Sequence, residues 1–190
     1  MLRAALATWR GGDVRDIAND IGPLISASAL QQLTGYAAEL RGTWLAQLPL
    51  PADLPPGHYF APRIIEISRD DWPKQEAFGP ILHIVRWQQG GLSELLDFIN
   101  TTGFGLTLAL HSRLPSHVAL LQQKARVGNL YVNRNQIGAV VGSQPFGGEG
   151  RSGTGPKAGG THYLQRFAVE RVISINTAAI GGTPELFNED

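Results

Sequence analysis

The sequence predicts an α/β fold in which a parallel β-sheet is flanked by helices. Short apolar runs alternate with helix-spaced segments through the middle of the chain, which is the pattern of a parallel sheet with crossover helices. The hydrophobic share of 43% and the charged share of 17% are typical of a globular protein. A chain of 190 residues is long enough to bury the core of one domain.

Two helices are expected before the sheet begins. Residues 1–10 have a helical pattern that Gly11 and Gly12 end. The second helix begins at Ser26 or Ser28, either of which can act as the N-cap, and continues to about Arg41. Its apolar stripe, which indicates core packing, consists of Leu30, Leu33, Ala37 and Leu40. Prolines between residues 49 and 56 exclude a helix there.

Four strands and two helices are expected next. The strands are predicted at residues 59–67, 81–87, 106–110 and 129–132. The helices are predicted at residues 93–99, with an acidic start at Glu94, and at residues 116–126, with Ser116 as the N-cap. Ligands of parallel sheets bind at the carboxyl ends of the strands. Asn133 and the glycine-rich segment after it follow one such end, which favours a binding site there.

The C-terminal region is expected to hold one short helix and one strand. Residues 162–167 have helical spacing, and residues 169–175 are a strand candidate. The polar members of this strand suit the edge of a sheet, where they would face solvent or a partner subunit. Residues 181–190 are polar and are expected to form a loose tail.

The segment from Gln144 to Gly160, called the glycine loop below, is the part of the chain that most requires a functional explanation. Its seven glycines are Gly147, Gly148, Gly150, Gly153, Gly155, Gly159 and Gly160. Such a segment can adopt positive φ repeatedly and bring backbone N–H groups close to a ligand. Arg151 and Lys157 add positive charge, and Ser152 and Thr154 add hydroxyl groups. This combination suits a small anion such as a carboxylate or a phosphate.

Two nucleotide-binding patterns and a flexible linker are the alternatives for the glycine loop. Three of its glycines have the dinucleotide spacing, but Pro156 follows where a helix is needed. The phosphate-loop pattern fails because Ala158, rather than Ser or Thr, follows Lys157. A flexible linker stays open as an alternative, although Pro145 and Phe146 indicate a loop that packs.

Charge and composition exclude several classes of protein. Sixteen basic and sixteen acidic residues cancel, so the chain has no electrostatic footprint for nucleic acid. No apolar run approaches the ~20 residues that span a bilayer, and residues 1–10 do not resemble a signal peptide, so we expect a cytoplasmic protein. The chain has no cysteine, which excludes disulfides and a thiol nucleophile. The five histidines lack the spacing of a helical metal site, so no metal is expected.

Five motifs along the chain resemble the C-terminal half of the aldehyde dehydrogenase superfamily. They are Glu76-Ala77-Phe78-Gly79-Pro80, Asn100-Thr101-Thr102-Gly103-Phe104-Gly105-Leu106, Gly128-Asn129-Leu130-Tyr131-Val132-Asn133, Pro145-Phe146-Gly147-Gly148 and Ser152-Gly153. Residues 20–25 are also similar to the segment shortly after the family's nucleophile, so the resemblance covers nearly the whole chain. Within the superfamily, residues 152–160 and 174–179 resemble the glutamate-semialdehyde (pyrroline-5-carboxylate) dehydrogenase region of a bifunctional proline-utilisation protein.

The resemblance implies an NAD-dependent oxidation of glutamate γ-semialdehyde to glutamate. In the family a cysteine attacks the aldehyde, hydride passes to NAD⁺, and water releases the acid. Glu76 matches the glutamate that accepts hydrogen bonds from the nicotinamide ribose, and Phe78 matches the aromatic residue near that ribose. Without the resemblance, Glu76 is a solvated loop carboxylate and Phe78 is a core residue.

The resemblance also assigns the substrate side of the site. Ser152, Gly153 and Thr154 match the loop that anchors the α-carboxylate of the substrate, which agrees with the anion site predicted from the glycine loop. Phe146 matches an aromatic residue that lines the aldehyde pocket, although by default it would be a core residue.

The family's nucleophilic cysteine, catalytic glutamate and nucleotide-binding domain have no counterpart in this sequence. Our hypothesis is that the chain is a truncated C-terminal portion of a semialdehyde dehydrogenase, that it is inactive alone, and that it holds no catalytic residue. Residues 1–168 would form part of the catalytic domain, residues 169–180 an oligomerisation strand and residues 181–190 a tail. Exposed apolar surface would favour a homo-oligomer. The alternative is a non-catalytic module that binds a carboxylate or serves assembly.

Overall fold

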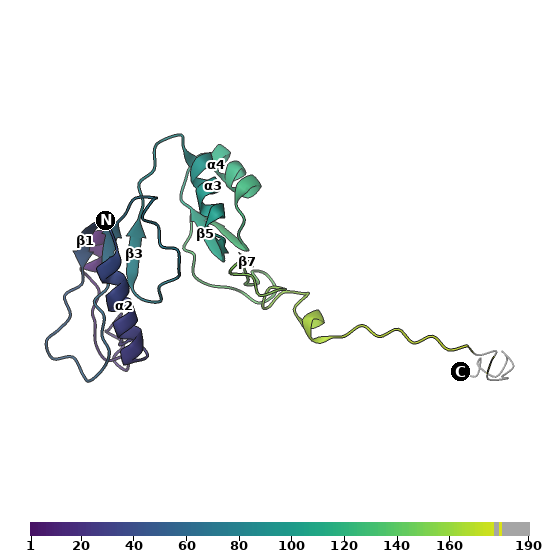
Figure 1. The fold of residues 1–190 in the computed structure, drawn as a ribbon, viewed down its shortest axis with the longest axis horizontal. Helices are drawn as coiled ribbons and strands as arrows, with labels where there is room; N and C mark the ends of the chain where they lie inside the picture. The colour runs from purple at the N-terminus through teal and green to yellow at the C-terminus, as the bar shows by residue number, and fades with distance from the viewer. Residues whose placement is uncertain (177–178, 180–190) are drawn as a thin grey trace. The chain divides into compact units, whose positions relative to one another are not determined.

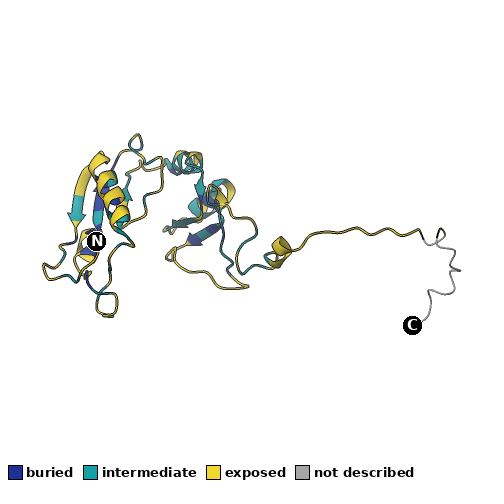
Figure 2. Cartoon of the chain, turned by 60° about the horizontal axis from the view of Figure 1, so that its bottom comes forward, coloured by how far each residue is buried: buried dark blue, intermediate teal, exposed yellow. Residues whose placement is uncertain are grey.

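The computed structural model of this chain describes residues 1–176 and residue 179 (Figure 1). The described residues divide into two compact units, of which the first is Met1–Leu95 and the second begins at Leu96. We describe each unit by itself. In each unit a short strand contains buried residues, β2 in the first and β6 in the second (Figure 2).

The first unit is built on a three-stranded mixed sheet in the order β1-β2-β3. Strand β2 (Arg63–Glu66) pairs in parallel with β3 (Ile81–Ile84), which confirms both predicted strands in shorter form. Strand β1 (Thr43–Gln47) pairs antiparallel with β2 and was not predicted. The parallel pair places Ile65, whose side chain is fully buried, at the centre of the sheet.

Helices α1 (Leu2–Leu6) and α2 (Ala27–Glu39) pack on opposite faces of this sheet. Leu6 packs with Ile64, whereas Leu33 belongs to the cluster against which Ile81 packs. Ile64 and Ile81 point to opposite faces because β2 and β3 pair in register with Ile64 opposite Leu82.

The ends of these two helices correct the sequence expectation in part. The Ser26 hydroxyl accepts a hydrogen bond from the Ala29 amide at 3.1 Å, so Ser26 is the N-cap and Ser28 is not. The first helix ends at Leu6 instead of Arg10, since Thr8 and Trp9 bond back to the preceding turn. Leu6 is its single buried residue, so little packing supports a longer helix.

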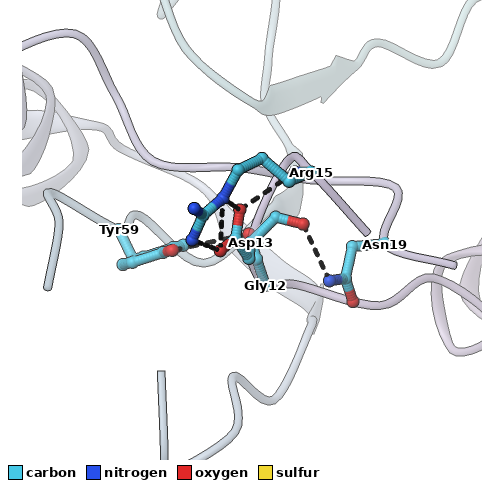
Figure 3. A network of polar contacts seen from close by, with 5 residues as sticks. All are labelled: Gly12, Asp13, Arg15, Asn19 and Tyr59. Carbon is cyan, nitrogen blue, oxygen red and sulfur yellow. Dashed lines mark hydrogen bonds and ion pairs between the residues drawn. The ribbon is translucent and has the colours of Figure 1, made fainter. Parts of the chain in front are cut away.

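A polar network holds the segment between the two helices (Figure 3). The Tyr59 hydroxyl donates to the Gly12 carbonyl at 3.4 Å, and the Asn19 amide donates to the Asp13 carbonyl at 3.0 Å. Arg15 pairs with the Asp13 carboxylate through its side chain and its backbone N–H. These hydrogen bonds from Arg15 lower the pKa of Asp13 to about 2.

The second unit contains the strand-helix-strand order that the sequence predicts. Strand β5 (Thr107–Leu110) pairs in parallel with β6 (Asn129–Val132), and α4 (Pro115–Lys124) connects them. Helix α3 (Leu92–Thr101) begins in the first unit and ends in the second. Asn100 joins α3 to α4, because its amide donates to the Lys124 carbonyl at 2.8 Å and its oxygen accepts from the Arg126 amide at 3.0 Å.

Three further expectations in the second unit need correction. Ser116 is not the N-cap of α4, because Leu114 holds that position and Pro115, which has no N–H, takes the first helical turn. Residues 162–167 contain a short 3₁₀-helix, η1 (Leu164–Phe167), rather than an α-helix. A two-residue ladder between β4 (Phe104–Gly105) and β7 (Glu149–Gly150) was not predicted.

The predicted strand at residues 169–175 does not form in the single chain. Residues 168–176 have neither helix nor strand, because a strand needs a hydrogen-bonding neighbour and none lies beside them among the described residues. The predicted tail at residues 181–190, and part of the expected oligomerisation segment, lie outside the described residues.

The parallel sheet of the prediction is therefore divided in the described part of the chain. One parallel pair lies in each unit, and β1 and β7 add antiparallel partners. The α/β fold class is confirmed, whereas a single parallel sheet is not what the described residues form.

Candidate functional site

The glycine loop is closed at its neck by backbone pairing. The Phe146 amide donates to the Ala158 carbonyl at 3.0 Å, and the Ala158 amide donates to the Phe146 carbonyl at 2.8 Å. The two limbs of the loop therefore run antiparallel where they leave the body of the unit. Phe146 is half-buried at this neck, so the structure places the predicted aldehyde-pocket residue at the base of the loop.

The tip of the loop is held against β4. The Arg151 amide donates to the Gly103 carbonyl at 2.9 Å, and the Ser152 hydroxyl accepts from the Gly105 amide at 3.2 Å. Strand β7 lies within the loop and pairs with β4. The glycine loop thus packs along both limbs, which favours a built site over the flexible linker that the sequence left open.

Gly150 shows why this packing requires glycine. Its φ is +58°, a conformation that residues with a side chain rarely adopt. A Cβ at this position would also lie 2.5 Å from the Gly103 carbonyl oxygen, which belongs to the backbone and cannot turn away. Glycine therefore allows the loop to approach β4 as closely as the Arg151 hydrogen bond demands.

Two adjacent backbone donors of the loop are open. The N–H groups of Thr154 and Gly155 donate to no protein acceptor among the described residues. By contrast, the Gly153 amide donates to the Gly150 carbonyl at 3.0 Å and is used inside the loop. The Ser152 hydroxyl accepts one hydrogen bond and keeps its own proton available to a ligand. Ser152 and Thr154 thus offer hydroxyls beside two open amides, whereas Gly153 serves the turn.

The two cations that the sequence assigned to an anion are used elsewhere. The Arg151 guanidinium lies over the Phe104 ring, 5.3 Å from its centroid. Lys157 donates to the Gly128 carbonyl and to the Asn129 side-chain oxygen at the base of the loop. Both side chains therefore hold the loop in this structure, whereas the sequence assigned their charges to a small anion.

Arg166 is a cation at the loop that sequence reasoning missed. Its guanidinium donates to the Thr154 carbonyl from η1. A Cβ at Gly155 would lie 3.6 Å from an Arg166 nitrogen, so this charge stands next to the open amides. Twelve residues separate Arg166 from Thr154, and no periodicity in that interval indicates that the two meet.

The predicted cofactor residues lie together in the first unit. Glu76 and Phe78 line a cavity of about 450 Å³ against α2. Phe78 is 84% exposed, so it is not a core residue. The other lining residues are Ala29, Gln32, Leu33, Tyr36, Gln75 and Ala77. The cavity thus has one carboxylate and one exposed aromatic ring.

Tyr36, which lines this cavity, forms a hydrogen-bonded pair with His83. The Tyr36 hydroxyl and the His83 Nε2 are 2.8 Å apart, and the two rings meet edge to face. Burial raises the pKa of Tyr36 and lowers the pKa of His83, so both side chains are held in their neutral forms. The pair joins α2 to β3.

Other classes of site were searched for in the described residues. Among residues 1–176 no cluster of His, Asp or Glu side chains could hold a metal ion. In the same part of the chain no helix is both long and apolar enough to cross a membrane.

Comparison with known protein families shows which family the chain belongs to. The sequence model of the aldehyde dehydrogenase family matches residues 1–173. The chain belongs to the aldehyde dehydrogenase family. Aldehyde dehydrogenases are oxidoreductases, and the family predicted from the five sequence motifs is confirmed.

Curated relatives within the aldehyde dehydrogenase family include proline-catabolic proteins. The bifunctional protein PutA of Klebsiella aerogenes is 43% identical over 178 residues, which cover 90% of this chain and 14% of that protein. 1-Pyrroline-5-carboxylate dehydrogenase 1 of Halalkalibacterium halodurans is 32% identical over 165 residues, or 86% of this chain and 32% of the relative. The chain thus spans much less than two thirds of either relative.

Solved structures of the same kinds of protein are also similar to this chain. A proline utilization A (PutA) variant of Bradyrhizobium japonicum is 45% identical, with a TM-score of 0.84 over 94% of this chain and 18% of that chain. A 1-pyrroline-5-carboxylate dehydrogenase from Thermus, solved with bound NAD, is 31% identical, with a TM-score of 0.72 over 86% of this chain and 32% of that chain. The α/β architecture is therefore shared with these longer chains.

Proposed function

We propose that this chain forms part of an NAD-dependent glutamate γ-semialdehyde dehydrogenase of proline catabolism, and that its glycine loop binds the α-carboxylate of the substrate. The names of the relatives support the substrate class. The observation that carries the proposal is the pair of open N–H groups at Thr154 and Gly155, next to the hydroxyls of Ser152 and Thr154.

These groups match the chemistry of a carboxylate. A carboxylate has two oxygens that accept hydrogen bonds from two adjacent amides or hydroxyls. Hydrogen bonds to an ionised acceptor are roughly twice as strong as neutral ones. Gly153 contributes to the same site by holding the turn between Ser152 and Thr154, and Arg166 adds positive charge beside it.

Glu76 and Phe78 are proposed as the cofactor side of the site. The Glu76 carboxylate would accept hydrogen bonds from the ribose hydroxyls of NAD, and the exposed Phe78 ring would pack on the ribose. An NAD-bound relative from Thermus supports the use of this cofactor. Phe146 is proposed to contact the aldehyde from the base of the glycine loop.

The chemical step needs a nucleophile that this chain does not carry. The sequence has no cysteine, so the aldehyde cannot be attacked by a thiolate of this polypeptide. We therefore expect no NADH from the pure chain with NAD⁺ and glutamate semialdehyde, measured by absorbance. Steady NADH formation by the cysteine-free chain would contradict this part of the proposal.

Self-association is proposed through residues 169–175. Val169, Val172, Ile173 and Ile175 are between 66% and 92% exposed. A segment with this much exposed apolar surface and no hydrogen-bonding neighbour among the described residues is suited to pair with a second copy. We propose a homo-oligomer on this basis, and a cytoplasmic location stays a prediction from the sequence.

A non-catalytic carboxylate-binding module is the second candidate. It is favoured by the fact that the glycine loop, β4 and η1, which supply every proposed carboxylate contact, lie in one unit. Binding of glutamate without binding of NAD by the pure chain would support this candidate over the first.

Equilibrium dialysis with labelled L-glutamate tests the carboxylate site. We expect a dissociation constant on the order of millimolar, because a few hydrogen bonds supply the affinity. Thr154→Val keeps the shape of the side chain and removes its hydroxyl, and it should weaken binding by roughly threefold to tenfold. Thr161→Val, at another exposed threonine, is the matched control and should leave binding unchanged. Equal glutamate affinity in wild type and Thr154→Val would show that the Thr154 hydroxyl does not contact the carboxylate.

A further inference from the structure

Asn129 lies at the start of β6 and is 8% exposed. Its amide nitrogen donates to the Pro145 carbonyl at 3.2 Å and to the Tyr131 hydroxyl at 3.3 Å. Its oxygen accepts from the Gly147 amide over a longer 3.5 Å. One buried side chain therefore fastens the first limb of the glycine loop at two backbone positions.

Lys157 fastens the second limb to the same place. Its ammonium group donates to the Gly128 carbonyl and, at 3.2 Å, to the Asn129 oxygen. Hydrogen bonds from a charged donor are stronger than neutral ones, and their strength rises where water is excluded. Since Asn129 accepts from both limbs, it couples Gly147 on one side to Lys157 on the other.

The backbone around these two side chains is closely packed. A Cβ on Gly128 would overlap the Gly147 carbonyl oxygen, and a Cβ on Gly147 would lie 3.2 Å from the Lys157 Cα. The limbs and the start of β6 therefore meet backbone to backbone.

We propose that Asn129 and Lys157 are positioning residues that hold the glycine loop in the shape required for carboxylate binding, an inference that rests on the function proposed for that loop. In this role they act through the loop and not through a contact with the carboxylate. Lys157 closes the neck, the neck fixes the register of the limbs, and the limbs present the amides of Thr154 and Gly155. The charge of Lys157 thus stabilises the neck of the loop and acts on the carboxylate site only through the shape of the loop.

Amide hydrogen exchange on the ligand-free chain tests directly whether Asn129 and Lys157 hold the neck of the loop, an arrangement called the clamp below. In Lys157→Met, which keeps the length of the side chain and removes its donors, the neck amides of Phe146 and Ala158 should exchange about tenfold faster or more. The Asn133 amide, which donates to Leu110 at the end of the β5–β6 pair, is the internal reference and should be unchanged.

Lys124→Met is the matched control, because Lys124 is outside the glycine loop and pairs with Asp97 on α3. It should leave the exchange of the neck amides as in wild type. Unchanged neck exchange in Lys157→Met would overturn the proposal, as would equal acceleration in the Lys124→Met control.

Glutamate dialysis of the same variants separates positioning from a general loss of stability. We expect Lys157→Met and Asn129→Leu to weaken glutamate binding by about tenfold under conditions where the Asn133 reference amide stays protected. Wild-type affinity in both variants would overturn the positioning role. If wild type itself binds no glutamate, the carboxylate function fails, while the exchange experiment still decides whether the clamp exists.

Discussion

Gly128 lies directly before β6, against the backbone of the glycine loop. A Cβ here would overlap the carbonyl oxygen of Gly147, which is a backbone atom and not a side chain that could turn away. We expect Gly128→Ala to destabilise the second unit by about 1–3 kcal/mol, the usual cost of overpacking. Urea unfolding followed through the NMR signal of Tyr131, which is buried in the same unit, measures this.

Gly35 supplies the control for that substitution. It lies inside α2, and an added Cβ would meet no atom within 4 Å. Gly35→Ala should therefore stabilise its helix by up to about 1 kcal/mol, because alanine is the better helix former. If Gly128→Ala were as harmless as Gly35→Ala, the close approach of loop and strand would be wrong.

His83 makes the first unit sensitive to mild acid. Burial lowers the pKa of His83 below its ordinary 6.5. The folded chain therefore favours the neutral ring, and the stability it gains is present above the ordinary pKa and is lost as the pH falls through the lowered value. We expect the urea midpoint of the first unit to fall between about pH 7.5 and about pH 5.5.

The substitution His83→Asn should reduce that fall, whereas His111→Asn, at an exposed histidine, should keep it. The readout is tryptophan fluorescence, since all four tryptophans, Trp9, Trp44, Trp72 and Trp87, belong to the first unit. An identical pH dependence in wild type and His83→Asn would show that another group titrates.

At the scale of elements, α2 offers the sharpest test because the sequence left its start open between Ser26 and Ser28. The structure selects Ser26, whose hydroxyl accepts from the Ala29 amide. Ser26→Ala should cost about 1 kcal/mol of stability in the first unit. Ser28 is the second residue of the helix, and Ser28→Ala should leave the stability unchanged or raise it slightly. The free energy of unfolding is measured by urea unfolding with tryptophan fluorescence. A larger loss of stability in Ser28→Ala than in Ser26→Ala would contradict Ser26 as the N-cap.

The elements that sequence reasoning found are those with a strong local signal. Strand β6 has the predicted bounds, 129–132, because an apolar run lies between Gly128 and the turn at Asn133. Strand β7 was missed because Glu149–Gly150 pairs through its backbone alone and leaves no apolar pattern. Strand β1 was missed because TWLAQ follows directly on a helix and precedes prolines, so its pairing with β2 is decided only by tertiary contacts.

The candidate site was predictable to the extent that it depends on residue type. Glycine density, hydroxyls and family motifs indicated the loop and the residues Ser152 and Thr154. The groups that each basic side chain contacts were not predictable, because the direction of these side chains depends on residues far away in the sequence. Lys157 turns to Gly128 and Asn129, while Arg166 reaches Thr154 from η1.

At the scale of the whole molecule, the apolar segment at residues 169–175 should govern association. We expect a concentration-dependent oligomer by light scattering. Val172→Lys, a charge at an exposed position of this segment, should shift the equilibrium to monomer and leave the fold of both units intact. Val14→Lys, at a position 71% exposed in the first unit, is the control and should keep the oligomer. A monodisperse wild-type monomer would contradict the proposal.

The most direct test of the account is an amide NMR titration of the labelled chain with L-glutamate, with a diamine of similar length as the control. If the glycine loop is a preformed carboxylate anchor, glutamate alone should shift amide signals between Arg151 and Gly155, most strongly those of Thr154 and Gly155, whose N–H groups are open. Equal shifts with the diamine, or no shift in this segment at millimolar glutamate, would contradict the carboxylate function of the loop.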